Sequence, residues 1–170
     1  QATYGEFDIF LTYLNITTVF TMLGMNQNLV KEVPKPSNSP GRSLALLWNS
    51  ILTSSMLVVV SMAVLYLVWP ALGLTRDVIV FFGIALLIKT LFTMLDGYLQ
   101  GIGKIIKVTV FNVLLNNAIK CVVYLLVVVL GSGGLLAAVL SFLISELICL
   151  VLRGNDIIRR KNREAITIDR

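Results

Sequence analysis

The stretch LALLWNSILTSSMLVVVSMAVLYLVW at residues 44–69 decides the fold class of this chain. It contains no charged side chain over its 26 residues. A helix needs only about 20 mainly apolar residues to cross the hydrocarbon core of a bilayer. The stretch is therefore long enough to cross the membrane once, and it predicts a transmembrane helix.

Four further apolar stretches qualify in the same way, and the predicted spans are 9–29, 44–69, 78–99, 108–130 and 135–152. Of the 170 residues, 57% are hydrophobic and 14% are charged, whereas about a quarter of a soluble domain is charged. The sequence predicts an all-α membrane protein: one polytopic bundle of transmembrane helices over residues 1–170, ending in a basic cytoplasmic tail at 153–170. The remaining residues are too few for a separate soluble domain.

Composition excludes several other classes of protein. The net charge of +5 comes from short clusters between apolar stretches, so we expect no nucleic-acid partner. Cys121 and Cys149 lie inside apolar stretches and are interpreted as small buried hydrophobic residues, which excludes a disulfide scaffold. The chain has no histidine and shows neither a metal-ligand cluster nor a nucleophile beside a base. We therefore expect no metal, no cofactor and no enzymatic activity.

Basic residues are distributed unevenly between the two sets of loops. If the connection at 32–43 is cytoplasmic, eleven of the 14 Lys and Arg residues fall on the cytoplasmic side and only Arg76 falls outside. Because Lys and Arg are concentrated in cytoplasmic loops, we expect the amino end of the chain outside and the tail inside. The chain starts at Gln1 without a signal peptide, and an odd number of spans starts outside. We therefore expect it to be part of a longer protein.

Four ionisable side chains lie within the predicted spans: Lys89, Asp96, Lys120 and Glu146. Lys89 and Lys120 fall near the middle of their spans, where a charge costs about 2.5–3.5 kcal/mol on insertion scales. Ionisable residues at such depths usually serve a function.

Other polar residues share a helical face with each of these charged residues. The first set, spaced at i, i+4, i+7 and i+11, is Lys89, Thr93, Asp96 and Gln100. The second, at intervals of four, is Asn112, Asn116, Lys120 and Tyr124, and a smaller set is Ser141, Ser145 and Glu146. Polar faces in lipid must turn towards protein or water, so we expect them to line a shared interior.

Two interpretations of the lysines remain open. In the first, Lys89 and Lys120 pair with Asp96 and Glu146 only to hold helices together. In the second, they line a wet, positively biased cavity. We favour the cavity, because Asp96 lies two helical turns from Lys89, about 10 Å along the axis. Such a cavity suits a phosphate or diphosphate group.

Three short motifs resemble one family of exporters. They are YGEF at 4–7, GMNQNLVKEV at 24–33 and LQGIGK at 99–104. Their order and spacing resemble those of the polysaccharide biosynthesis, or O-antigen (Wzx-type), flippases of the multidrug/oligosaccharidyl-lipid/polysaccharide (MOP) superfamily. By this resemblance the chain covers helices two to six, a partial amino-terminal lobe of a two-lobe exporter.

The resemblance implies a function in the bacterial cytoplasmic membrane. Members carry polyprenyl-diphosphate-linked oligosaccharides across it, by rocking two lobes around a central lumen. Expected partners are this lipid-linked substrate, membrane lipids and other polysaccharide assembly proteins. The candidate substrate-binding residues in the lumen are Lys89, Lys120, Gln100, Asn116 and Asn112, and the candidates for ion coupling or charge pairing are Asp96 and Glu146.

Three alternatives stay open beside the flippase. The first is an extruder of drugs or organic cations from the same superfamily, for which buried carboxylates should dominate. The second is a non-transporting membrane scaffold whose buried charges pair. The third, a membrane-bound transferase, lacks clustered catalytic residues.

Overall fold

The structure is a computed structural model that describes residues 2–35, 38–72, 76–130 and 135–168. Its elements are α1 (Ala2–Met22), α2 (Met25–Glu32), α3 (Pro40–Leu72), α4 (Arg76–Gly101), α5 (Ile105–Val110), the π-helical turn η1 (Phe111–Asn116), α6 (Asn117–Leu130) and α7 (Leu135–Ile168). No strand occurs in these described ranges, and the prediction of an all-α membrane protein is confirmed.

Four helices in the described residues are long and apolar enough to cross a membrane, and a bent pair makes a fifth candidate. The four apolar segments are Gly41–Leu67, Ile79–Gly101, Ile105–Leu126 and Ala138–Asn155. They overlap the predicted spans at 44–69, 78–99, 108–130 and 135–152. This is the pattern of a multi-pass membrane protein.

The first predicted span is broken rather than continuous. Leu23 and Gly24 both have positive φ, 40° and 75°, and the segments Phe7–Met22 and Met25–Glu32 meet there at an angle of 52°. Glycine adopts this left-handed conformation without the steric penalty of a side chain. Apolar composition alone cannot show such a break, so the sequence predicted one span at 9–29.

The last helix is longer than its predicted span. Residues 153–168, expected to be a basic tail after the membrane, continue α7 without interruption; residues 169 and 170 lie outside the described part. No helix-breaking proline occurs between Leu135 and Ile168. Arg153 therefore belongs to the packed helix.

The start of α3 is set by local chemistry. Ser39 precedes the helix, and its Oγ accepts a hydrogen bond from the backbone N–H of Arg42 at 3.4 Å. Pro40 takes the first helical position, where its fixed φ suits the helix and its missing N–H costs nothing. The proline-rich connection before it reverses the chain between α2 and α3.

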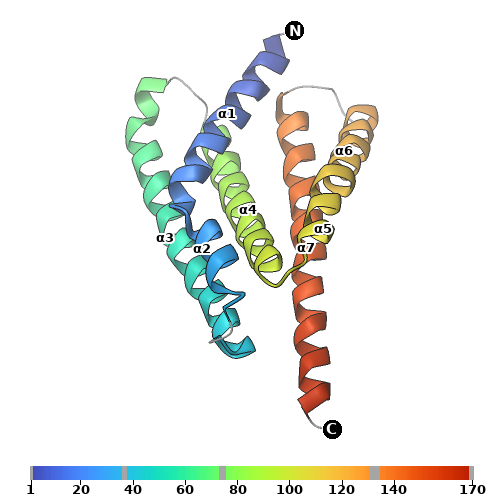
Figure 1. The fold of residues 1–170 in the computed structure, drawn as a ribbon. Coiled ribbons are helices and arrows are strands. Elements are labelled where there is room, and N and C mark those ends of the chain that lie inside the picture. Colours follow the sequence, from blue (N-terminus) through green and yellow to red (C-terminus); the bar gives the residue numbers. More distant parts are fainter. Residues whose placement is uncertain (1, 36–37, 73–75, 131–134, 169–170) are drawn as a thin grey trace.

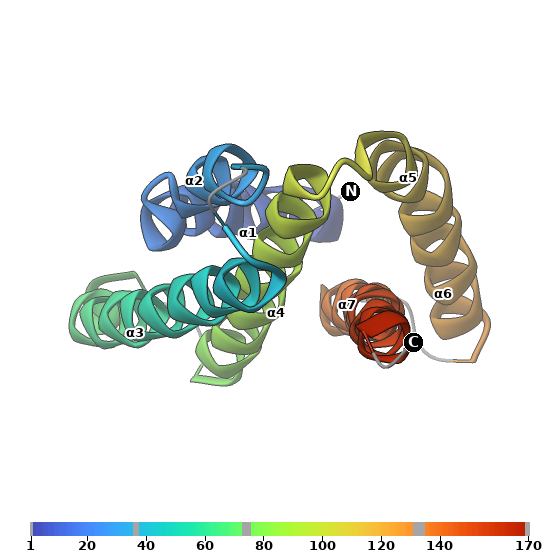
Figure 2. The same cartoon turned by 60° about the horizontal axis from the view of Figure 1, so that its bottom comes forward.

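Helix α4 lies at the centre of the bundle. It contacts α1, α2 and α3 on one side and α7 on the other (Figures 1 and 2). Half of its apolar segment is buried, against 11% of that of α3. Helices α3 and α6 therefore expose apolar faces to the surroundings, which in a membrane are lipid tails.

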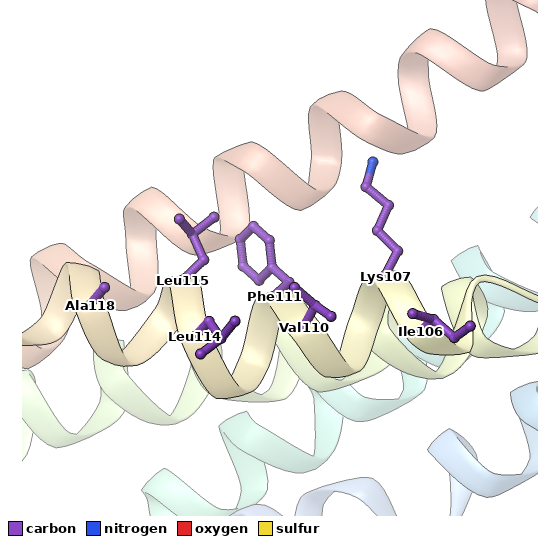
Figure 3. A pocket seen from close by; sticks show the side chains of 7 residues that line it. All are labelled: Ile106, Lys107, Val110, Phe111, Leu114, Leu115 and Ala118. Carbon is purple, nitrogen blue, oxygen red and sulfur yellow. The ribbon is translucent and has the colours of Figure 1, made fainter.

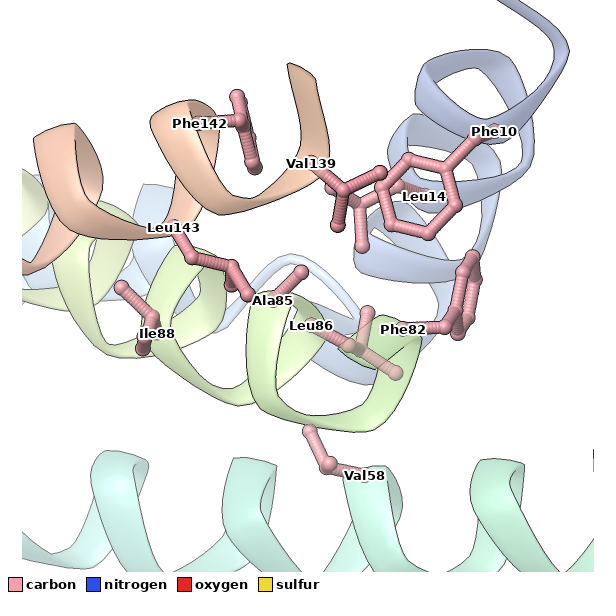
Figure 4. Packing of buried hydrophobic residues seen from close by; sticks show 10 residues of the cluster. All are labelled: Phe10, Leu14, Val58, Phe82, Ala85, Leu86, Ile88, Val139, Phe142 and Leu143. Carbon is pink, nitrogen blue, oxygen red and sulfur yellow. The ribbon is translucent and has the colours of Figure 1, made fainter. Parts of the chain in front are cut away.

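Two apolar clusters hold the bundle together. The larger joins α1, α3, α4 and α7 (Figure 4), and its buried members are Phe10, Leu14, Val58, Phe82, Ala85, Leu86, Ile88, Val139, Phe142 and Leu143. The smaller joins α2, α3 and α4 through Leu29, Val33, Leu47, Met94 and Tyr98. Side chains of α4 contribute to both clusters, which explains its burial.

Two glycines let α2 lie directly against α4. A Cβ atom added to Gly97 would lie 2.9 Å from the backbone oxygen of Asn26. One added to Gly101 would lie 2.9 Å from that of Leu29. Small residues four apart commonly permit this close approach between membrane helices. The bend at Gly24 brings α2 onto this surface.

We expect Gly97→Ala to loosen the contact between α2 and α4. The added methyl group meets backbone that has to shift, and overpacking of this kind costs about 1–3 kcal/mol. The midpoint of thermal unfolding in detergent should fall. Gly154→Ala in α7 is the matched control, because its Cβ would have no neighbour within 4 Å. Equal unfolding midpoints for the two variants would contradict the close contact.

Candidate functional site

The predicted polar faces lie on neighbouring helices. Helix α7, which carries Glu146, packs against both α4 and α6. It thereby brings the carboxylate of Glu146 between the helix of Lys89 and the helix of Lys120. The three charged side chains form the cluster that we call the lysine site.

Lys120 and Glu146 form an ion pair across α6 and α7. The distance from Lys120 Nζ to Glu146 Oε1 is 2.7 Å, and the two side chains are 32% and 5% exposed. The ammonium group also lies 5.0 Å from the centroid of the Phe142 ring, within the range of a cation–π interaction. The anion is buried while the cation remains partly open.

Lys89 has a different partner. Its Nζ donates a hydrogen bond to Oδ1 of Asn15, a residue of α1. Among the described residues no carboxylate lies within ion-pair distance of Lys89. The lysine site thus contains two cations and one anion.

A second polar cluster, the arginine cluster, lies nearer the end of the bundle where α4 ends and α5 begins. Arg153 forms an ion pair with Asp96. Asn112 donates from Nδ2 to Asp96 Oδ2 at 2.6 Å and accepts at Oδ1 from Arg153 Nη2 at 2.9 Å. Only 2% of the arginine is exposed. The cluster ties α4, η1 and α7 together.

Aromatic rings complete the arginine cluster. The guanidinium carbon of Arg153 lies 4.3 Å from the centroid of the Phe111 ring and 5.3 Å from that of Phe92. A planar guanidinium can stack on such rings while its N–H groups donate in its own plane. The environment therefore satisfies a charge that would otherwise be expensive in the membrane.

Arg153 was missed as a site residue by the sequence analysis, which assigned it to the cytoplasmic tail. Helical spacing was the available signal. Glu146, Cys149 and Arg153 follow one another at i, i+3 and i+7, and such residues share one face. Asp96 was expected as a possible partner of the lysines, but its ion-pair partner is Arg153.

The π-turn η1 explains how the polar stripe on α5–α6 stays aligned. Residues four apart drift around an α-helix, because a turn holds 3.6 residues, whereas a π-turn holds more. Asn112 and Asn116 both lie in η1. Asn116 Oδ1 accepts a hydrogen bond from Cys149 Sγ of α7 at 3.3 Å, so both asparagines reach α7.

Gln100, the remaining predicted residue, lies one turn beyond Asp96 and near the end of α4. It is partly buried. This position places it closer to the arginine cluster than to the lysine site.

An apolar groove runs along α5, η1 and the start of α6 (Figure 3). It is lined by Ile106, Lys107, Val110, Phe111, Leu114, Leu115 and Ala118. None of the predicted site residues lines it. Its apolar side chains are typical of a surface that faces lipid.

The described part of the chain contains no group of three or more His, Cys, Asp or Glu residues that could hold a metal ion. Both cysteines are free thiols. The interpretation as a buried residue is confirmed for Cys149 but wrong for Cys121, which is exposed. The lysine site offers two ammonium groups and one carboxylate within the depth of the apolar helices.

Comparison with known proteins gives one match. Residues 1–165 match the family model described as polysaccharide biosynthesis protein. No curated protein and no solved structure matches the chain.

The losses of stability from removing Arg153 and Asp96 should not be additive. Arg153→Gln or Asp96→Asn alone leaves a buried charge without its partner, which costs about 3–5 kcal/mol. The double variant removes both charges, so it should unfold at a higher temperature than either single variant. Thermal unfolding in detergent measures this, and strictly additive losses would contradict the pairing.

Proposed function

Because the chain belongs to the polysaccharide biosynthesis protein family, the family of MOP-type polysaccharide and O-antigen flippases, we propose that it flips a lipid-linked polysaccharide precursor. In this proposal it forms part of a transporter in the bacterial cytoplasmic membrane. The transported lipid carries its sugar through a diphosphate group.

The observation that carries the proposal is the lysine site. Lys89 and Lys120 lie on apolar helices able to span a membrane, and together they outnumber the single carboxylate beside them. A cation at this depth is costly and is retained mainly for function or pairing. The excess positive charge suits the diphosphate of the substrate.

The described contacts weaken the alternative of a cation extruder. Both carboxylates that could attract an organic cation are already paired, Asp96 with Arg153 and Glu146 with Lys120. The same two ion pairs support the alternative of a non-transporting scaffold. That alternative does not explain Lys89, whose ammonium group donates to the amide oxygen of Asn15 rather than to a carboxylate. The family is typically one of transporters rather than enzymes.

We propose that the arginine cluster is structural and that Asn112 serves it rather than the substrate. Asn112 already uses both ends of its amide within the cluster. Asn116 and Gln100 remain secondary candidates for polar contacts with the sugar. The residues that we assign first to the substrate site are Lys89 and Lys120.

The proposed orientation places the end of α4 and the start of α5 in the cytoplasm. The carboxyl ends of α2, α4 and α7 lie at the same end of the bundle as the starts of α3 and α5 (Figure 1). Lys31, Lys35, Arg42, Lys104 and Lys107 lie in these segments. Cytoplasmic loops favour such residues. Proposed partners there are anionic lipids and other assembly proteins.

Replacing both lysines should stop export. We expect Lys89→Gln with Lys120→Gln in the full-length protein to lower export of the lipid-linked precursor about tenfold or more, because each lost charge-assisted hydrogen bond is worth about 1.5–3 kcal/mol. Cells whose surface polysaccharide depends on this protein provide the measurement, at matched protein levels. Lys35→Gln is the control, because Lys35 is exposed and its ion pair is with Glu32, three residues away.

The variant Lys120→Gln with Glu146→Gln separates transport from scaffolding. It removes both charges of the pair and leaves two neutral amides of similar shape. Normal export by this variant would show that the pair only holds helices together. Loss of export with an unchanged unfolding temperature is the result expected of a substrate contact.

The orientation can be tested by labelling. In a protein without native cysteines, Lys35→Cys should react with a membrane-impermeant maleimide only when the cytoplasmic face is accessible. Arg76→Cys at the start of α4 should react from the other face. The reverse pattern would overturn the proposed orientation.

A further inference from the structure

The two carboxylate oxygens of Glu146 differ in their partners. Only 4% of the residue is exposed. One carboxylate oxygen, Oε1, lies 2.7 Å from Lys120 Nζ. The other, Oε2, is buried and has no hydrogen-bond partner among the described residues. A carboxylate can accept from two donors at once, so Glu146 has capacity for a second cation.

Lys89 is the second cation of the lysine site. It lies on α4, which packs against α7 as α6 does. Its neighbour Ile88 belongs to the same buried cluster as Leu143 of α7, three residues before Glu146. Lys89 Nζ donates to Asn15, an amide that does not neutralise its charge. Glu146 therefore stands between one paired lysine and one lysine without a paired carboxylate.

We propose that Glu146 is an exchangeable counter-ion: it pairs with Lys120 while the site is empty, and it transfers to Lys89 when a phosphate group of the substrate binds Lys120. The inference rests on the proposed function and refines it. Lys120 becomes the phosphate contact, and Lys89 becomes the positioning residue that receives the displaced carboxylate.

The exchange solves an electrostatic problem of transport within a membrane. A buried carboxylate that loses its partner is costly, and so is an ammonium group left alone after substrate release. If Glu146 moves between the two lysines, Lys120 is paired before, during and after binding. The Lys120 side chain is 32% exposed, against 5% for Glu146, so part of it is open to an incoming anion.

The exchange also links occupancy to helix packing. The pair joins α7 to α6 in the empty site and would join α7 to α4 in the loaded site. A ligand shifts an equilibrium only through different contacts in its two states. Here the substrate charge supplies that difference.

A binding cycle with four variants tests the proposal. The full-length protein is purified in neutral detergent, and the affinity for a short-chain dialkyl diphosphate is measured by calorimetry. Lys120→Gln should weaken binding about tenfold or more, the effect of one charge-assisted hydrogen bond. Glu146→Gln should strengthen binding by a similar factor, because no carboxylate competes for Lys120.

The decisive comparison is Lys89→Gln alone and with Glu146→Gln. Lys89→Gln should weaken binding about tenfold, because the displaced carboxylate then has no partner. Adding Glu146→Gln should restore the affinity to that of the Glu146→Gln variant, because no displaced charge remains. A direct contact of Lys89 with the diphosphate would leave the double variant about tenfold weaker than Glu146→Gln alone, and that result would overturn the exchange.

Two outcomes distinguish failure of the proposed function from failure of the exchange. If Lys120→Gln binds the diphosphate as tightly as the natural protein, the proposed function itself fails. If Lys120→Gln loses binding but the variant with both Lys89→Gln and Glu146→Gln binds more weakly than Glu146→Gln alone, only the exchange fails. Should Lys89→Gln not fold, Lys89→Arg replaces it: it retains a cation for Glu146 and must keep binding within about threefold, and a larger loss would contradict the exchange.

Discussion

The need to pair every charge held within hydrocarbon determines how the second half of this bundle is arranged. Helix α7 carries Glu146, Cys149 and Arg153 on one face, and each finds its partner on a helix beside it. The partners are not interchangeable, since they lie at successive levels of α5–α6 and α4. A slip of α7 along its axis would separate several pairs together, so polar contacts fix its position more strictly than apolar packing can in lipid.

Among the described residues, helices α1 to α4 are held together by close packing rather than by ion pairs. Gly97 and Gly101 leave a flat strip on α4, and the bend after α1 lays α2 across it. Apolar contacts from Leu29 and Tyr98 complete this region. Helix α4 thus has two different surfaces: one packs closely through small residues, and the other presents Lys89 and Asp96 to α7. This division explains why its sequence mixes glycine, charge and large apolar residues.

The class of fold was predictable from the sequence because the membrane imposes a simple rule on length and polarity. Lys89, Lys120 and Glu146 were identified as candidates for the same reason, since a charge stands out in an apolar segment. The partners were not predictable. Whether Asp96 pairs with Lys89 or with Arg153 depends on how α7 is placed beside α4, and helical periodicity says nothing about neighbours. The break at Leu23–Gly24 escaped prediction because an apolar segment with one glycine looks the same whether straight or bent.

The extra residue held in η1 has a consequence for how the protein tolerates changes in chain length. If one residue is removed from Phe111–Asn116, five residues wound as an α-helix turn the chain about as far as six in the wider turn, so α5 and α6 keep nearly the same relative orientation. The positions of Asn112 and Asn116 against α7 change instead, because both side chains lie in the turn that is shortened. Insertions and deletions should be rare in this turn among functional versions of the protein, whereas the connection between α2 and α3 can vary in length at little cost.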